Sequence, residues 1–135
     1  MSVGLLLVSH DGIASSLLET AMQMITDCTL NIELLTVERD SDPDEMLKHA
    51  HHLVNKLDTG DGVLILSDLF GSTPCNIAMA CTTNAKVNAI AGLNLSMLVR
   101  VMNYPELDLS DLTVKAISGG QEGILQIRQK EEHAN

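Results

Sequence analysis

The chain has 135 residues, of which 45% are hydrophobic and 19% are charged, a composition typical of a globular domain rather than a disordered segment. Its formal net charge of −10 disfavours binding to nucleic acid or to anionic membranes, but it suits basic patches on partner proteins. One Phe, one Tyr and no Trp leave no aromatic surface on which bases could stack.

Short apolar segments alternate with longer amphipathic segments along the chain. The predicted strands are residues 3–8, 31–37, 63–66 and 87–91, with a short fifth strand at 124–127. The first helix is predicted after residue 12, where apolar side chains recur at helical spacing. The second helix is predicted to begin with Asp42 as N-cap, Pro43 at its first position and Glu45 closing a capping box, and to end at Gly60.

Three more helices are predicted in the second half of the chain. Thr73 and Pro74 begin the third helix, and the fourth lies between Gly92 and Pro105 with its methionines in the core. The last predicted helix spans residues 110–117 and stops at the glycine pair that follows it.

Strands that alternate with helices favour right-handed crossovers and therefore a parallel sheet. We predict an α/β fold: a doubly wound, mostly parallel four-stranded sheet of order 2-1-3-4, with helices on both faces. Residues 1–127 are predicted to form a single domain, and residues 128–135 a charged, flexible tail. In such sheets ligands bind at the carboxyl ends of the strands where the strand order reverses, here after strands one and three.

The N-terminus lacks the basic segment of a signal peptide, and its apolar run is too short to span a membrane. Three cysteines form no CxxC pair, which favours a reducing compartment. We therefore expect a cytoplasmic protein without direct membrane insertion.

Two polar loops follow the strands at the predicted switch point. The first contains Ser9, His10 and Asp11, and the second begins with Asp68. A carboxylate that binds one imidazole nitrogen leaves the other free as a nucleophile, and we assign these roles to Asp68 and His10.

A helix N-terminus follows Asp68 and offers backbone N–H groups for a phosphate, with Gly71, Ser72 and Thr73 as the predicted phosphate-binding residues. Nucleophile, orienting carboxylate and anion site together favour phosphoryl transfer through a phosphohistidine. This chemistry requires no metal and no other cofactor.

The sequence resembles the mannose-type IIA components of the bacterial phosphoenolpyruvate-dependent sugar phosphotransferase system. The resemblance rests on the stretches GLLLVSHDGIASSLLETA, GVLILSDLFGSTPCNIA, AIAGLNLSMLV and ISGGQEGI, and on the motif Asp-x-x-Gly-x-[Ser/Thr]-Pro-x-Asn. It implies that His10 accepts phosphate from HPr and donates it to a IIB component, with Asp68 orienting His10 and residues 71–73 binding the phosphoryl group. It also implies a homodimer in which the strand at 123–127 is exchanged.

Two positions depart from the family pattern. Asp11 stands where Gly commonly follows the histidine, and its carboxylate would repel a phosphoryl group if it faced the site. Ser72 also stands at a common Gly position. Ser9 and Asn94, which lie beside or just past predicted strands, are weaker candidates for the site.

Other functions remain open. One alternative is the phosphotransfer subunit of a dihydroxyacetone kinase, which shares the Ser-His start. Another is a regulatory module, which stays open because the sequence ends after the IIA-like stretch. A metal site on residues 48–52 lacks a completing ligand, and residues 40–51 lack the Gly and Glu of a calcium loop.

Overall fold

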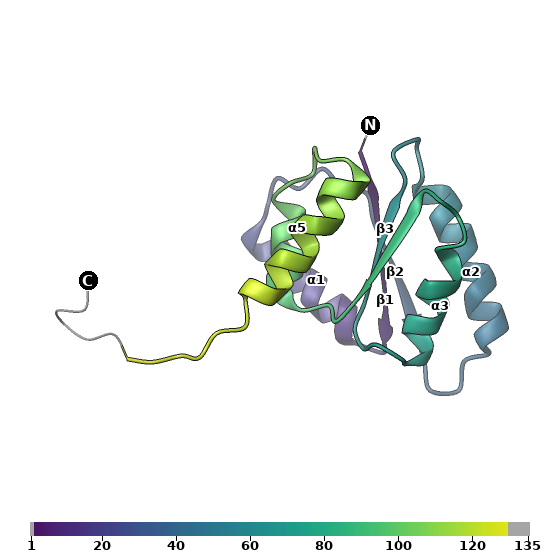
Figure 1. Cartoon of the computed structure of the whole chain (residues 1–135). Coiled ribbons are helices and arrows are strands. Elements are labelled where there is room, and N and C mark those ends of the chain that lie inside the picture. Colours follow the sequence, from purple (N-terminus) through teal and green to yellow (C-terminus); the bar gives the residue numbers. More distant parts are fainter. Residues whose placement is uncertain (1, 130–135) are drawn as a thin grey trace.

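Four parallel strands form the centre of the computed structural model, which describes residues 2–129 (Figure 1). The strands are β1 (Gly4–His10), β2 (Ile32–Val37), β3 (Val63–Ser67) and β4 (Val87–Ala91), in the spatial order β2-β1-β3-β4. The helices are α1 (Ile13–Met24), α2 (Pro43–Leu57), α3 (Thr73–Cys81), α4 (Leu95–Met102) and α5 (Leu109–Glu122). The predicted fold class and strand order are confirmed.

Two hydrophobic cores lie on opposite faces of the sheet. Leu5 and Leu7 of β1 pack with α1, α4 and α5, whereas Leu6 and Val8 pack with α2 and α3 on the other face (Figure 1). All four side chains are fully buried, and burial stabilises each by about 1.5–3 kcal/mol. Because both faces are covered, β1 is apolar along nearly its whole length, and its end is held rigidly.

Strand β1 is longer than the sequence predicts, so His10 is its last residue rather than the start of a loop. Ser9 pairs with Thr36 and His10 with Val37 in the ladder to β2. Backbone pairing does not require apolar side chains, so the ladder continues past Val8. Ser9 is only 1% exposed, and its hydroxyl donates to the His10 carbonyl and accepts from the Ala14 amide, which ties β1 to α1.

Helix α2 differs from the prediction at both ends. Asp42 caps it as expected, but its carboxylate accepts from the Asp44 amide, and the Glu45 carboxylate lies 3.6 Å from Lys48 Nζ instead of closing a capping box. The helix ends at Leu57 rather than at Gly60. The Asp58 carboxylate there accepts the Gly60 and Gly62 amides, and the Gly60 hydrogen bond above all lowers the pKa of Asp58.

The glycine pair does not end the last helix, because α5 runs through Gly119 and Gly120 to Glu122. Both glycines are buried against α4. A Cβ atom at Gly119 would lie 2.5 Å from Arg100 Cβ, and one at Gly120 would lie 2.9 Å from Met97 Cε. Here the glycines allow two helices to approach closely, which a sequence pattern cannot distinguish from a helix stop.

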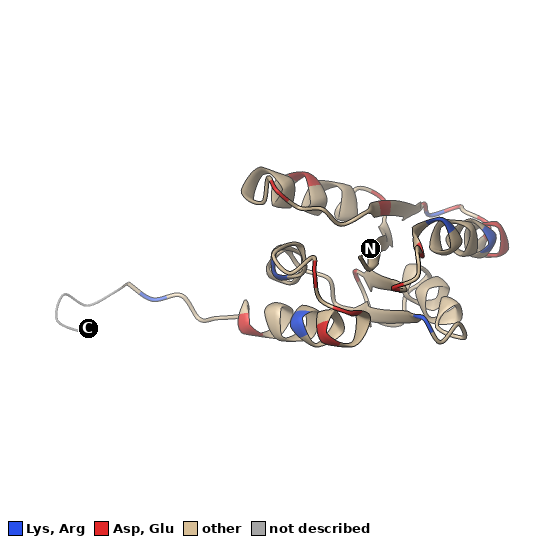
Figure 2. Cartoon of the chain, turned by 90° about the horizontal axis from the view of Figure 1, so that it is seen from above, with Lys and Arg blue, Asp and Glu red and all other residues tan. Residues whose placement is uncertain are grey.

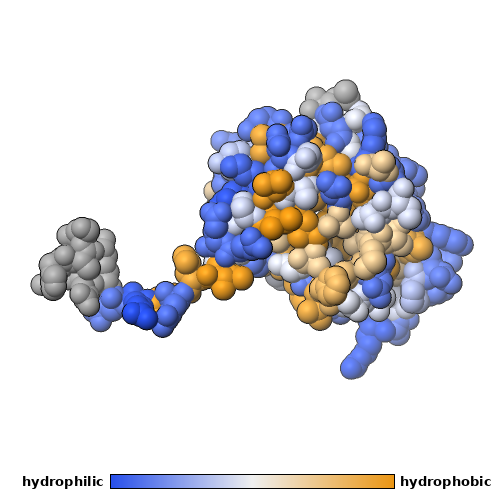
Figure 3. All heavy atoms as spheres, in the orientation of Figure 1, coloured by the Kyte–Doolittle hydropathy of each residue, from blue (hydrophilic) through white to orange (hydrophobic). Residues whose placement is uncertain are grey.

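Beyond Gly123 the single chain forms no fifth strand in residues 124–129. This segment leaves the domain, and Ile124, Leu125 and Ile127 are 77%, 77% and 94% exposed (Figure 3). Strand exchange and the boundaries 1–127 and 128–135 stay predictions, and residues 130–135 lie outside the described part. Within residues 2–129, no helix combines the length and apolarity needed to span a bilayer.

Charged residues of both signs occur in the helices and in the loops that connect them (Figure 2).

We predict that Gly119→Ala destabilises the protein by about 1–3 kcal/mol, because the steric conflict with Arg100 exceeds the roughly 1 kcal/mol gain in helix propensity. Thermal or urea unfolding measures the change. Ser110→Ala, at an exposed position of the same helix, is the control. A Gly119→Ala variant as stable as the wild type would contradict the packing role of this glycine.

Candidate functional site

His10 and Asp68 meet at the carboxyl ends of the two central strands. Asp68 directly follows β3, which pairs with β1, and its Oδ2 lies 2.7 Å from His10 Nδ1. The same oxygen accepts the backbone N–H of His10 at 3.2 Å. The His10 side chain is 45% exposed and that of Asp68 only 7%, so a buried carboxylate supports an accessible ring.

This contact determines which ring nitrogen keeps a free lone pair. A carboxylate only accepts hydrogen bonds, so in the neutral imidazole Nδ1 carries the proton and Nε2 holds the free lone pair. No hydrogen bond joins Nε2 to another described residue. The arrangement has the geometry of an oriented nucleophile beside its orienting group.

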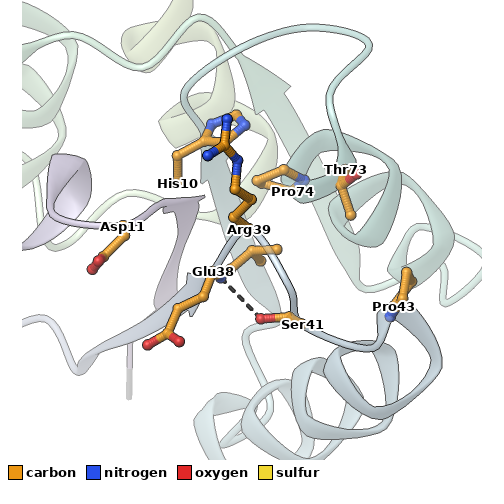
Figure 4. Close-up of a pocket in the computed structure, with 9 residues that line it drawn as sticks. His10, Asp11, Glu38, Arg39, Ser41, Pro43, Thr73 and Pro74 are labelled. Atoms are coloured by element: carbon orange, nitrogen blue, oxygen red, sulfur yellow. Dashed lines mark hydrogen bonds between the residues drawn. The ribbon is translucent and has the colours of Figure 1, made fainter.

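An open cavity of about 570 Å³ lies next to the His10 ring. It is bounded by the end of β1, the loop after β2, and the first residues of α2 and α3 (Figure 4). Asp11 also borders it, but in Figure 4 its carboxylate points away from the His10 ring. The carboxylate at this unusual position therefore does not face the ring nitrogen that would react.

The three predicted phosphate-binding residues have different positions. Gly71 adopts a left-handed backbone with φ of +83°, which glycine tolerates best, and it turns the chain into α3. The Ser72 hydroxyl donates to the Leu69 carbonyl at 2.6 Å and is therefore engaged within its own loop. Thr73 is the member of this group that lines the cavity.

The N-terminus of α3 brings groups to the cavity that could bind an anion. The Thr73 and Cys75 amides make no backbone hydrogen bond in the described residues, and Pro74 has no N–H to offer. Free amides and the positive end of a helix dipole together favour a bound anion. A phosphoryl group is one such anion.

Ser9 and Asn94 do not join the site. The Ser9 hydroxyl is buried in the contacts that link β1 to α1. Asn94 is the N-cap of α4: its side chain accepts from the Met97 amide at 2.8 Å and donates to the Gly120 carbonyl at 3.2 Å. The hydrogen bonds of both side chains therefore connect elements of the fold.

Arg39 lines the cavity and was not among the residues selected from the sequence. It lies two residues past Val37, which is the register partner of His10. The predicted strand order placed the end of β2 beside the end of β1, so a basic residue just past β2 could have been predicted to lie near His10. In the described residues, no cluster of three or more His, Cys, Asp or Glu side chains could bind a metal ion.

Comparisons with known proteins agree on one family. The model of the EIIA-man family, described as "PTS system fructose IIA component", matches residues 4–117. The "PTS system mannose-specific EIIAB component" of Escherichia coli (strain K12) is 28% identical over 133 residues. That alignment covers 96% of this chain but 41% of the relative, so the chain spans less than half the length of the curated relatives it matches.

Two solved structures share the fold at 25% sequence identity. The mannose/sorbose-specific IIA subunit from Enterococcus faecalis has a TM-score of 0.85, with 97% of this chain and 98% of that chain covered. The IIA protein associated with the fucose utilization operon of Streptococcus pneumoniae has a TM-score of 0.77, with 93% and 96% covered.

We predict that Asp68→Asn changes the His10 tautomer. Asn can donate as well as accept, so the preference for a proton on Nδ1 weakens and the Nε2–H form of His10 gains population. Long-range ¹H–¹⁵N correlation spectra at a pH where imidazole is neutral measure this change. Exposed His49, His51 and His52 serve as internal controls. An unchanged His10 tautomer would show that Asp68 does not orient the ring.

Proposed function

The chain belongs to the EIIA-man family of phosphotransferase-system IIA components, and on that premise we propose that it is a phosphocarrier whose His10 accepts a phosphoryl group from HPr and donates it to a IIB component. The observation that carries this proposal is the short Asp68 contact to Nδ1, which leaves Nε2 available beside a cavity with a helix N-terminus. The protein would act in the cytoplasm, as a protein-to-protein phosphotransferase.

The proposed step is a displacement at phosphorus. The Nε2 lone pair of His10 attacks the phosphorus of the donor's phosphohistidine, the new N–P bond forms, and the old N–P bond returns its electron pair to the donor nitrogen. Positive charge that develops on the His10 ring is stabilised through Nδ1–H by the Asp68 carboxylate. Donors at the start of α3, among them Thr73, bind the phosphoryl oxygens. Transfer to IIB is the same step with His10 as the donor.

The surroundings of the site suit a macromolecular partner. Leu69 and Phe70 directly follow Asp68 and are 59% and 78% exposed, and large exposed apolar side chains next to a site favour protein docking. A net charge of −10 suits partners with a basic docking face. We assign no sugar, because a IIA carrier contacts proteins and phosphate, and the matched proteins carry the names of several sugars.

We also propose that the protein is a homodimer with exchanged C-terminal segments. Strand β4 pairs only with β3 among the described residues, so one of its edges is open. Apolar hollows of about 400 and 210 Å³ lie on either side of this edge, and Figure 3 shows apolar side chains on this face of the molecule. Residues 123–127 of a second copy would pair with β4 and bury their exposed apolar side chains there.

We predict that the protein incubated with phosphoenolpyruvate, enzyme I and HPr gains one phosphoryl group. The N–P bond should be labile in acid and stable in base. His10→Ala should abolish the labelling, because within residues 2–129 His10 is the one histidine that contacts Asp68 and lines the cavity. Intact mass spectrometry before and after acid treatment measures the label.

His49→Ala is the matched control, since it removes an exposed histidine from α2 and should leave the label unchanged. A folded wild-type chain that takes no label from active upstream enzymes, with HPr from several sources, would refute the carrier proposal. Labelling that persists in His10→Ala would refute the assignment of the residue.

We predict that replacing Ile124, Leu125 and Ile127 together by Ser converts the dimer to a monomer at micromolar concentration, because the exchanged segment loses the apolar area that it buries. Light scattering after size-exclusion chromatography measures the mass. Gln126→Ser alone is the control. A wild-type monomer, or a triple variant that remains dimeric, would exclude exchange through this segment.

A further inference from the structure

A hydrogen-bonded turn places Arg39 at the border of the cavity that His10 also lines. The Glu38 amide donates to the Ser41 hydroxyl at 2.9 Å, and the Ser41 amide donates to the Glu38 carbonyl at 3.1 Å. This turn closes directly after Val37, the residue that pairs with His10 across the sheet. Neighbouring strands are about 4.8 Å apart, so the long Arg39 side chain leaves the backbone within reach of the His10 ring. In Figure 4 its guanidinium extends from the turn towards the part of the cavity where the His10 ring lies.

Arg39 differs from every other cationic side chain in residues 2–129, because it makes no hydrogen bond, ion pair or aromatic-ring contact within that range. Lys48, Lys56 and Arg100 pair with carboxylates. Lys86 donates to the Gly60 carbonyl, Lys115 lies 4.5 Å from the centre of the Tyr104 ring, and Arg128 donates to Gln126. An unpaired guanidinium at the border of an anion-binding cavity retains all five of its N–H donors for a ligand.

We infer that Arg39 binds the phosphoryl oxygens of phosphorylated His10 and stabilises the phosphorylated form of the protein. This inference rests on the proposed carrier function and deepens it. The guanidinium reaches the phosphoryl group from the β2 side, while the α3 N-terminus with Thr73 reaches it from the side of α3. Two N–H groups of one guanidinium match two phosphoryl oxygens, a geometry that a lysine ammonium cannot reproduce.

The negative net charge of the chain explains why a cationic contact with the phosphoryl group would matter. Phosphorylation adds a dianion to a chain whose formal charge is already −10, and Asp11 and Glu38 also border the cavity. Arg39 is the one cationic side chain among the described residues that line this cavity. Because unpaired Arg39 breaks no existing ion pair when it binds phosphate, its contact favours the phosphorylated state without an opposing loss.

The experiment measures the equilibrium constant for phosphoryl transfer between HPr and this chain, approached from both directions, for four full-length proteins: wild type, Arg39→Ala, Arg39→Lys and Lys56→Ala. Lys56→Ala is the matched control, because it also removes one positive charge but does so beside Glu33, near the opposite end of β2. Circular dichroism establishes that each variant is folded. The ³¹P chemical shift of the isolated phosphoprotein reports contact with the phosphoryl group.

We expect Arg39→Ala to shift the equilibrium about tenfold towards phospho-HPr, which corresponds to the loss of one charge-assisted contact made by an exposed side chain. Arg39→Lys should show an intermediate shift, and Lys56→Ala should remain within about twofold of wild type because of solvent screening. The ³¹P signal should move in the Arg39 variants only.

An equilibrium constant and a ³¹P shift that are unchanged in Arg39→Ala would overturn the inference while the carrier function stands. Slower transfer in Arg39→Ala with an unchanged equilibrium would assign Arg39 to partner docking and would also overturn it. A wild-type chain that takes no phosphate at all would instead remove the carrier function, and with it the premise of this inference.

Discussion

One carboxylate oxygen organises the site. Asp68 Oδ2 accepts both the ring Nδ1–H and the backbone N–H of His10, two groups separated from Asp68 by 58 positions in the chain. The contact exists only because β1 and β3 are adjacent parallel strands that end at nearly the same level. The helices that pack on β1 and β3 hold these strands in place, and they therefore also hold His10 in its position beside Asp68. A shift of the ladder by one residue would turn the His10 side chain to the other face of the sheet and break the contact.

The sheet and the pairing of His10 with Asp68 could be predicted, because the sequence patterns that indicate them are periodic and local. Four apolar runs separated by helical patterns permit few arrangements once crossovers are right-handed, and the strand order 2-1-3-4 places His10 beside Asp68. The ends of the elements were less predictable. The ladder to β2 continues through Ser9 and His10, since main-chain pairing extends wherever the neighbouring strand extends.

Packing between helices produced the clearest error in the fold prediction. Gly119 and Gly120 look like a helix stop in the sequence, and in the structure they lie inside α5 where α4 approaches. Glycine is suited both to ending a helix and to close packing between helices, and only the position of α4 shows which role these two glycines have.

Asn94 shows the same ambiguity for polar residues. An amide just past a strand could face the crevice, but here the Asn94 side chain caps α4 and donates to the Gly120 carbonyl. Arg39 was missed for the opposite reason, because it lies in a charged run of sequence that resembles an ordinary solvated turn.

A carrier must hold its phosphoryl group firmly enough to load it and loosely enough to release it, and the geometry is consistent with this balance. The buried carboxylate acts on Nδ1, away from the atom that reacts, so it orients the ring without contacting the transferred group. The groups at the cavity that could donate to an anion include the N-terminus of α3, the Thr73 side chain and Arg39. All lie near solvent, where water and salt weaken each contact with an anion. His10 itself is nearly half exposed, which leaves room for a second protein to approach the same nitrogen. At physiological salt the field of individual charges is screened beyond about 8 Å, so the net charge of −10 would act mainly on the approach of partners. In the proposed carrier, retention of the phosphoryl group would then depend on the few donors at the cavity.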